Sequence, residues 1–211
     1  MTESQSNIYK EHHQTNRQIG FSIMKEERGA LLEKLVGKGK KVLDIGCRDG
    51  ALTKFFTPGN QVLGVDIDDT ALSRARELGI ETMKMDLHGD WVELGGRKFD
   101  VVVAGEVLEH LYHPGKIAQK AREVLTESGV FVGSVPNAFS LKNRLRYLKG
   151  SKRYTPLSDP THINQFSASD LEIILKKVFP EVEILGLGRY QKLADLSPNL
   201  FAFDLFFVCR K

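Results

Sequence analysis

Val42-Leu43-Asp44-Ile45-Gly46-Cys47-Arg48-Asp49-Gly50 is the stretch of sequence on which the fold depends. It is an apolar run that reaches an acid and then turns through two glycines toward a segment with helical character. In an α/β sheet of parallel strands, ligands bind beyond the carboxyl ends of the strands, where loop backbone is exposed and a glycine allows close approach. We therefore predict that this stretch is the first strand and ligand-binding loop of such a sheet, and that functional residues lie at strand ends.

Three later stretches repeat the pattern of a short apolar run that ends at an acid. Residues 62–65 end at Asp66, residues 82–85 end at Asp86 and residues 101–105 end at Glu106. Together with Asp44, the acids follow one another at steps of 22, 20 and 20 residues, the length of one strand, one short helix and two turns. We predict a Rossmann-like, doubly wound α/β fold with a mostly parallel sheet of about seven strands, the last one antiparallel, and helices on both faces.

Composition and length bound the class of protein. The 211 residues are 41% hydrophobic and 27% charged, which is ordinary for a soluble globular chain with a substantial core. We expect a helical lead-in over residues 1–40 and one ligand-binding domain over residues 41–211, with a basic insertion at residues 138–166. Apolar runs stay below membrane-spanning length and residues 1–18 lack a secretory apolar core, so we expect a cytoplasmic protein. Cys47 and Cys209 give neither a metal-binding spacing nor a disulfide framework.

Further elements follow from apolar periodicity and from turn residues. Expected helices cover residues 21–36, 51–56, 71–78, 115–126 and 141–148, and one that begins at Ser167 or Ser169 and runs to residue 179. The fifth strand is expected over residues 129–135. Residues 182–187 and 201–209 read as two strands that could pair antiparallel at one edge of the sheet.

The glycine pattern of the first loop separates possible ligands. A dinucleotide loop has the form Gly-x-Gly-x-x-Gly, but these positions hold Gly46, Arg48 and Ala51, which disfavours a nicotinamide oxidoreductase. Four acids at one sheet edge would repel a pyrophosphate. They suit a ligand that carries hydroxyl groups, an amine and a positive centre. S-adenosylmethionine is such a ligand.

The quoted stretch, together with Asp66, Asp86 and residues 99–110, resembles class I S-adenosylmethionine-dependent methyltransferases of the type 11/12-like group. The likeness runs from about Lys41 to the C-terminus. It implies that residues 41–211 form a methyltransferase domain with S-adenosylmethionine as cofactor, which transfers a methyl group to an O or N atom of a small or medium-sized acceptor. The cofactor-binding residues that the resemblance implies are Asp44, Ile45, Gly46, Cys47, Arg48, Gly50, Asp66, Ile67, Asp86, Leu87 and Glu106.

The resemblance also implies individual roles. Asp44 would meet the ammonium group of the cofactor and Asp66 would accept both ribose hydroxyls, because a carboxylate has two oxygens for a vicinal diol. Ile67, Asp86 and Leu87 would contact adenine, and Glu106 would lie near the sulfonium and amino end. Each acid could instead be a strand-end or helix-cap carboxylate.

Arg48 departs from the family pattern, which commonly has a glycine there. Its side chain either pairs with the cofactor carboxylate or points into solvent. We expect binding to be retained if the φ angle of Arg48 stays below zero.

Two histidines are candidates for the acceptor side. Methyl transfer from a sulfonium is a direct displacement, so the protein positions the acceptor and removes its proton where needed. His110 and His162 could act as bases, or could hold loops by hydrogen bonds. With Glu106 and Glu109 they could also bind a divalent ion, a pattern similar to metal-dependent small-RNA 2′-O-methyltransferases and quinone-biosynthesis O-methyltransferases, although Glu-x-x-Glu-His serves packing in many relatives.

The second half of the chain leaves two further questions open. Residues 135–137, 161–163 and 198–202 resemble the methionine-biosynthesis W proteins, which are associated with the homoserine acyltransferase. This resemblance implies an alternative, a non-catalytic S-adenosylmethionine-binding regulatory partner. Six cations, Lys142, Arg144, Arg146, Lys149, Lys152 and Arg153, lie in one segment without an acid. They could hold an acidic acceptor group or form a solvated helix face. Aromatic residues are too sparse there for a nucleic-acid platform.

Overall fold

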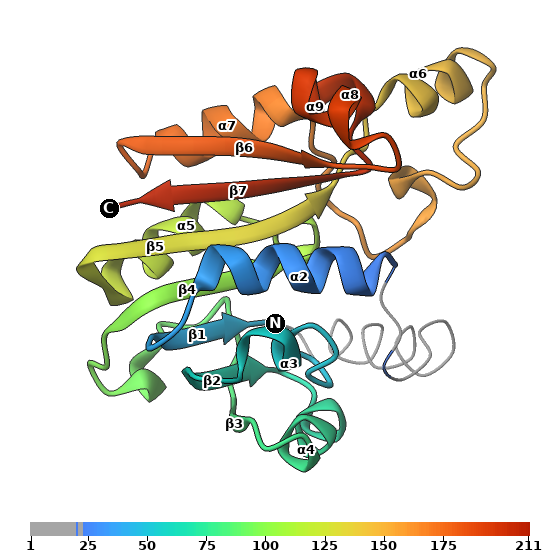
Figure 1. The fold of residues 1–211 in the computed structure, drawn as a ribbon. Helices are drawn as coiled ribbons and strands as arrows, with labels where there is room; N and C mark the ends of the chain where they lie inside the picture. Colours follow the sequence, from blue (N-terminus) through green and yellow to red (C-terminus); the bar gives the residue numbers. More distant parts are fainter. Residues whose placement is uncertain (1–19, 21–22) are drawn as a thin grey trace. The chain divides into compact units, whose positions relative to one another are not determined.

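The computed structural model describes residue 20 and residues 23–211. Its seven-stranded sheet has the order β3-β2-β1-β4-β5-β7-β6 (Figure 1). Strands β1 to β4 pair in parallel, whereas β7 is antiparallel to both β5 and β6. This arrangement confirms the predicted mixed sheet with an antiparallel last strand. The strands are β1 (Lys41–Ile45), β2 (Gln61–Asp66), β3 (Glu81–Lys84), β4 (Phe99–Gly105), β5 (Leu125–Pro136), β6 (Glu181–Leu187) and β7 (Asp204–Arg210).

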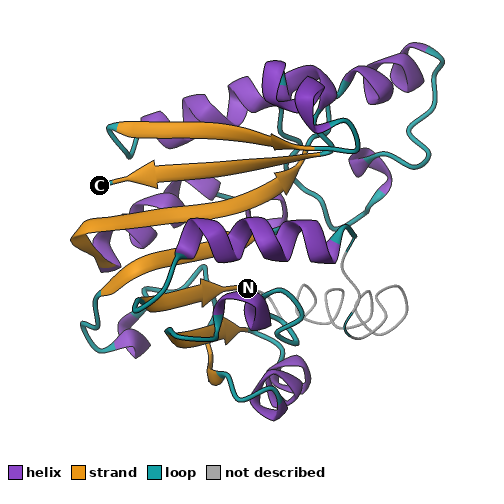
Figure 2. Cartoon of the chain, viewed as in Figure 1, coloured by secondary structure: helices purple, strands orange, loops and turns teal. Residues whose placement is uncertain are grey.

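The chain divides into two compact units, the first ending at Val103 and the second running from Ala104 to Lys211. Described helices and 3-10 turns of the first unit are α2 (Lys25–Val36), α3 (Thr53–Phe56), α4 (Asp69–Glu77) and η1 (Val92–Leu94). Those of the second unit are η2 (Leu108–His110), α5 (Pro114–Val124), α6 (Leu141–Leu148), η3 (Pro156–Ser158), α7 (Ala168–Lys176), α8 (Gln191–Leu196) and α9 (Pro198–Phe201) (Figure 2).

Local signals in the first unit explain where its helices begin and end. The Asp68 side chain caps α4, because its Oδ1 accepts from the backbone N–H groups of Thr70 and Ala71. Helix α2 ends at Gly37, which has a φ of 75°. The predicted start of this helix at residue 21 lies outside the described residues, as does most of the expected lead-in.

The core of the second unit is aromatic. Phe131 of β5 packs on Phe207 of β7 and on Phe179, with ring centroids 4.9 and 5.9 Å apart. Helices α5 and α7 pack against each other, and they contact β5 and β6 respectively. Ser167 caps α7 through a hydrogen bond from the Asp170 backbone N–H, which decides between the two predicted start positions.

Several element boundaries differ from the predictions. Phe201 belongs to α9 rather than to the last strand, which begins at Asp204. Neither α8 nor α9 was expected, because helices of six and four residues are too short to show a period. Strand β5 begins at Leu125, where the preceding helix was expected to continue. Within the described part of the chain, we find no helix with the length and apolar character that crossing a bilayer requires.

Candidate functional site

The first acid of the predicted site, Asp44, lies inside β1 and is only 5% exposed. Its Oδ2 accepts a hydrogen bond of 2.6 Å from the Thr53 hydroxyl at the start of α3. Burial raises the pKa of Asp44 to about 7, and the nearby charge of Asp66 acts in the same direction, while the Thr53 hydrogen bond opposes both. Asp44 is therefore a carboxyl group whose ionisation a nearby cation would favour.

The loop after β1 is held against β2. The backbone N–H groups of Gly46 and Cys47 both donate to the Val65 carbonyl oxygen, at 2.8 and 3.1 Å. A Cβ atom on Gly64 would lie 2.7 Å from the Cys47 sulfur, so strand and loop are in tight contact. The Ile45 side chain is fully buried, which leaves its backbone as the part that could contact a ligand. Burial, with the charges of neighbouring carboxylates, raises the pKa of the Cys47 thiol, which disfavours the thiolate form at neutral pH.

The φ angle of Arg48 is positive, so the condition under which we expected binding to be retained is not met. Its φ is 51°, in the left-handed region that non-glycine residues seldom adopt. The conformation is stabilised by a 3.0 Å hydrogen bond from the Arg48 backbone N–H to Asp66 Oδ2. The strained residue therefore connects the loop to the end of β2.

Asp66 is the point where loop, strand and helix meet. Its second oxygen, Oδ1, accepts from the Asp68 backbone N–H at 2.9 Å. Burial raises the pKa of Asp66, and backbone N–H donors from Asp68, Arg48 and Ile67 act in the opposite direction. A carboxylate has about four acceptor sites, so Asp66 keeps capacity for a ligand hydroxyl. Ile67, next in the chain, is half-buried.

The segment after β3 holds Asp86 and Leu87, which together with Ile67 were predicted to contact adenine. Asp86 Oδ1 accepts from the His88 backbone N–H at 2.9 Å, in a turn that the Gly89 N–H closes on the Asp86 carbonyl. Leu87 is 8% exposed, and its carbonyl accepts from Trp91 Nε1 at 3.1 Å. The predicted cofactor residues of the first unit thus lie at or just beyond the carboxyl ends of three neighbouring parallel strands.

Sequence reasoning missed two residues that support this edge. Thr53 orients Asp44, as described above. Asp49 is 6% exposed, and its Oδ2 accepts from the Gly20 backbone N–H at 2.8 Å while Oδ1 accepts from the Ala51 N–H. Asp49 could have been recognised from the sequence, because it is an acid inside the glycine turn, but only the acids at the strand ends were considered.

Glu106, the fourth predicted acid, belongs to the second unit. It has a φ of 58°, and its backbone N–H donates to the Ser134 carbonyl at 2.9 Å. The Ser134 hydroxyl donates to Glu106 Oε1 at 3.0 Å. Ser134, fully buried in β5, therefore orients Glu106, a contact that no local sequence pattern predicts.

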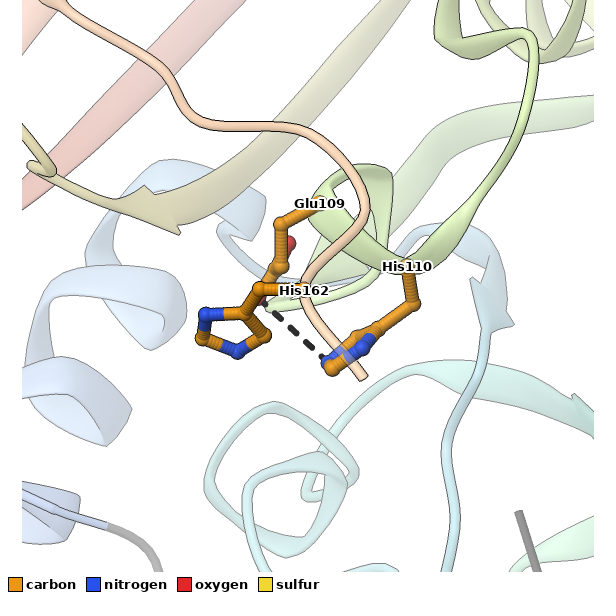
Figure 3. Close-up of side chains that lie close together, drawn as sticks. All are labelled: Glu109, His110 and His162. Atoms are coloured by element: carbon orange, nitrogen blue, oxygen red, sulfur yellow. Dashed lines mark ion pairs between the residues drawn. The ribbon is translucent and has the colours of Figure 1, made fainter. Parts of the chain in front are cut away.

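The acids and bases that follow Glu106 form a compact cluster, which we call the EHH cluster: Glu109, His110 and His162. Figure 3 shows Glu109 and His110 on the η2 segment and His162 on a separate loop, all turned toward one another. Glu109 is 1% exposed, and its Oε1 lies 3.8 Å from His110 Nε2. The two imidazole rings meet edge to face, with centroids 4.8 Å apart. His110 and His162, which are 52 positions apart in the sequence, are thus in contact.

Backbone contacts determine the orientation of His110. Its Nδ1 lies 3.0 Å from the Thr161 carbonyl oxygen. A carbonyl oxygen only accepts, so Nδ1 carries the proton and Nε2 is the basic nitrogen of neutral His110. The basic nitrogen consequently faces the buried Glu109 carboxylate.

Asp159 and Asn164 fix the loop that carries His162. Asp159 Oδ1 accepts from both the backbone N–H and the hydroxyl of Thr161, and Oδ2 lies 3.7 Å from His162 Nε2. The Asn164 backbone N–H donates to the Glu109 carbonyl at 2.9 Å, and its side-chain amide donates to the Leu111 carbonyl. The loop and the η2 segment therefore hold each other in place.

The EHH cluster contains three of the four residues considered as metal ligands. Among the described residues, the group whose donor atoms all lie within 4.8 Å of one another comprises Glu109, His110 and His162, without Glu106. Two imidazoles and one carboxylate suit Mn, Fe, Co or Zn better than Mg or Ca, which prefer oxygen. The donor types fit such an ion, although the spacing must contract for bonds of about 2.1 Å to a single metal.

The chain is similar to known proteins of one family. A family model described as methyltransferase domain matches residues 14–178. A probable S-adenosylmethionine-dependent methyltransferase of Mycobacterium tuberculosis is 30% identical over 162 residues, which cover 75% of this chain and 55% of that protein. A ubiquinone biosynthesis O-methyltransferase of Azorhizobium caulinodans is 28% identical over 182 residues, covering 78% of this chain and 70% of that protein.

A solved structure shares the fold. The crystal structure of a methyltransferase from Archaeoglobus fulgidus, described as S-adenosylmethionine-dependent, aligns with a TM-score of 0.69 at 18% identity, covering 97% of this chain and 99% of that one. The chain therefore belongs to the methyltransferase-domain family, among the class I S-adenosylmethionine-dependent methyltransferases. S-adenosylmethionine is the cofactor of this class, as expected. The chain spans 55% of the length of the mycobacterial relative that it matches.

Proposed function

We propose that this protein transfers a methyl group from S-adenosylmethionine to a hydroxyl oxygen of a small acceptor. The observation that carries the proposal is the EHH cluster, in which His110 presents a basic nitrogen beside a buried carboxylate. The similarity to a ubiquinone biosynthesis O-methyltransferase supports oxygen, rather than nitrogen, as the acceptor atom.

The strand ends of the first unit supply the proposed cofactor contacts. Asp44 receives the ammonium group, because a cation stabilises the ionised form of a buried carboxylate. Asp66 accepts the two ribose hydroxyls while the backbone of Arg48 and Asp68 keeps its carboxylate in place. Ile67, Asp86 and Leu87 contact adenine. Glu106, which the Ser134 hydroxyl orients, belongs to the second unit and is our candidate for the amino end of the cofactor.

In the proposed reaction, the acceptor oxygen attacks the methyl carbon, and the bond from that carbon to sulfur breaks with its electron pair on sulfur. S-adenosylhomocysteine leaves as a neutral thioether. The acceptor proton moves to His110 Nε2, and Glu109 stabilises the imidazolium that forms, since its Oε1 is 3.8 Å away. His162, whose Nε2 lies near Asp159, positions the acceptor hydroxyl.

Substitution of His110 tests this function. Production of S-adenosylhomocysteine is measured with a panel of catechols and a matched panel of primary amines. Positioned proton transfer contributes roughly 10² to 10⁴ in rate, so His110→Gln should lower kcat on the catechols by at least about 100-fold. His113→Gln is the matched control, because His113 is exposed and lies outside the cluster. An unchanged rate in His110→Gln, or methylation of amines alone, would contradict the proposal.

A metal-assisted version of the same reaction is the second candidate, favoured by the donor atoms of the EHH cluster. Glu109, His110 and His162 would hold the ion, and a bound divalent cation stabilises a developing alkoxide. Binding of Mn²⁺ is measured by calorimetry in the wild type and in Glu109→Gln. Stoichiometric binding that Glu109→Gln abolishes, with activity lost on chelation, supports this version. Full activity in chelator leaves His110 alone as the base.

A further inference from the structure

Helix α6 is held by its polar face. Asn143 is 8% exposed, and its Nδ2 donates to the Asn137 carbonyl oxygen at 3.0 Å. One turn further on, the Tyr147 hydroxyl donates to the Ala138 carbonyl oxygen at 2.9 Å. These bonds anchor one side of α6 to the segment that follows β5, and thereby determine which side faces outward.

The outward side of α6 is apolar. Leu141, Leu145 and Leu148 occupy one side of the helix by their spacing, and they are 42%, 51% and 83% exposed. A surface helix of a globular protein normally turns its apolar side inward. Helix α6 does the opposite, so its leucines are placed where they could contact something outside the unit.

Cations border these leucines. By helical spacing, Lys142 and Arg144 lie on either side of the leucine row, and both are exposed. Arg144 Nε donates to the Phe139 carbonyl at 2.6 Å, and Arg146 Nη1 donates to the Tyr154 carbonyl at 3.2 Å, which ties the positive segment to the helix. No acidic residue occurs between residues 141 and 158.

A second apolar group lies on the neighbouring elements. Helix α6 contacts α9, which itself packs against α8 (Figure 1). Leu196 of α8, Phe201 of α9 and Phe203 after it are 79%, 37% and 49% exposed. Exposed apolar residues thus lie on three helices that contact one another in turn, and apolar side chains that lie close together mark an interaction site more often than scattered ones do.

We propose that α6, with the apolar residues of α8 and α9, docks on the surface of an anionic lipid bilayer. The leucines would enter the acyl boundary while the cations meet headgroup phosphates, the arrangement of an interfacial amphipathic helix. A nucleic acid or a small acidic acceptor would use the cations but would leave the exposed leucines without a role. With eight residues, α6 is far too short to span a bilayer. The proposal does not depend on the identity of the methyl acceptor.

Co-sedimentation with vesicles tests the proposal. The full chain is mixed with vesicles of phosphatidylcholine alone or of phosphatidylcholine with phosphatidylglycerol. Binding should be stronger to the anionic vesicles and should weaken as salt rises. The double variant Leu145→Glu/Leu148→Glu should lower the anionic partition at least about tenfold, since it places charges at the apolar boundary. Ile173→Glu, on the 57% exposed Ile173 of α7, is the matched control and should bind as the wild type.

Folding controls and a charge-reversal variant complete the test. Circular dichroism and affinity for S-adenosylhomocysteine verify that each variant is folded. Lys142→Glu/Lys149→Glu should weaken binding to anionic vesicles and leave weak binding to neutral ones unchanged. Absence of vesicle binding, equal loss in Ile173→Glu, or tighter binding to a single-stranded RNA oligonucleotide that the leucine variant leaves intact would overturn the proposal.

Discussion

At the scale of single residues, burial of Asp44 opposes its ionisation in the folded chain. Its pKa is about 7 in the folded chain against 3.8 for an ordinary aspartate. The folded state therefore holds the proton more tightly than the unfolded state does. As the pH rises from about 4 to 7, ionisation favours unfolding, by an amount on the order of a few kcal/mol. We infer that this buried carboxyl group serves binding rather than stability.

The affinity for S-adenosylhomocysteine should therefore depend on pH. If the ionised form of Asp44 accepts the ligand ammonium, affinity should rise as the pH increases through about 7 and fall by up to about tenfold per pH unit below it. Asp44→Asn should bind weakly and without this dependence. The measurement is calorimetric titration at pH values on both sides of 7, the approximate pKa of Asp44 in the folded chain.

Thr53→Val provides a sharper version of this pH test. The Thr53 hydroxyl donates to Asp44 Oδ2 and thereby lowers its pKa. Its removal should shift the pH dependence of affinity to higher pH, while Asp66 keeps its own hydrogen bonds. A pH dependence that stays in place in Thr53→Val, or that persists in Asp44→Asn, would assign the titration to another group.

At the scale of elements, the glycine turn after β1 depends on Gly50. Its φ is 76°, and an added Cβ would lie 2.7 Å from Ile80 Cδ1. Gly50→Ala should lower the free energy of unfolding by about 2–3 kcal/mol, from the left-handed backbone and from overpacking together. Gly79→Ala is matched in φ, at 78°, but has open space around the new Cβ, so it should cost only about 1 kcal/mol. Urea denaturation measures the free energy of unfolding of both variants. Equal decreases would show that packing around Gly50 contributes nothing.

Elements differ in how far the sequence could predict them. The strand ends at Asp44, Asp66 and Asp86 follow from local patterns, because an apolar run, an acid and a turn are adjacent in the chain. Helices α8 and α9 escape such reasoning, since they are short and are stabilised by packing against β6 and each other. Thr53 and Asp49 lie close in sequence to the predicted loop and could have been considered. Their hydrogen-bonding partners, however, are shown only by the structure.

The EHH cluster could be predicted from the sequence only in part. Glu109 and His110 attracted attention as a local motif, and His162 as an isolated histidine in a long loop. Their meeting depends on Asn164, which contacts the carbonyls of Glu109 and Leu111 more than fifty residues earlier. Local sequence propensities cannot predict a hydrogen bond across that separation. The individual residues of the cluster could therefore be proposed from the sequence, but their proximity could not.

At the scale of the whole molecule, the predicted roles divide between the two units. The residues proposed for ribose and adenine belong to the unit that ends at Val103, whereas the EHH cluster and its supporting loop belong to the unit that begins at Ala104. Substitutions in the two units should therefore affect different steps, cofactor binding in the first and turnover in the second.

Asp66→Asn and Asn164→Ala test this division. Asp66→Asn should weaken S-adenosylhomocysteine binding by about 10- to 100-fold, because a hydrogen bond to a charged group contributes about 1.5–3 kcal/mol. Asn164→Ala removes the side-chain bond to the Leu111 carbonyl, which loosens η2 and misplaces His110. It should lower kcat about tenfold or more and leave the affinity for S-adenosylhomocysteine within about twofold. Asp69→Asn, an exposed acid paired with Lys84, controls for the loss of one negative charge. If Asn164→Ala weakened cofactor binding as strongly as Asp66→Asn does, the two units would not have separate roles.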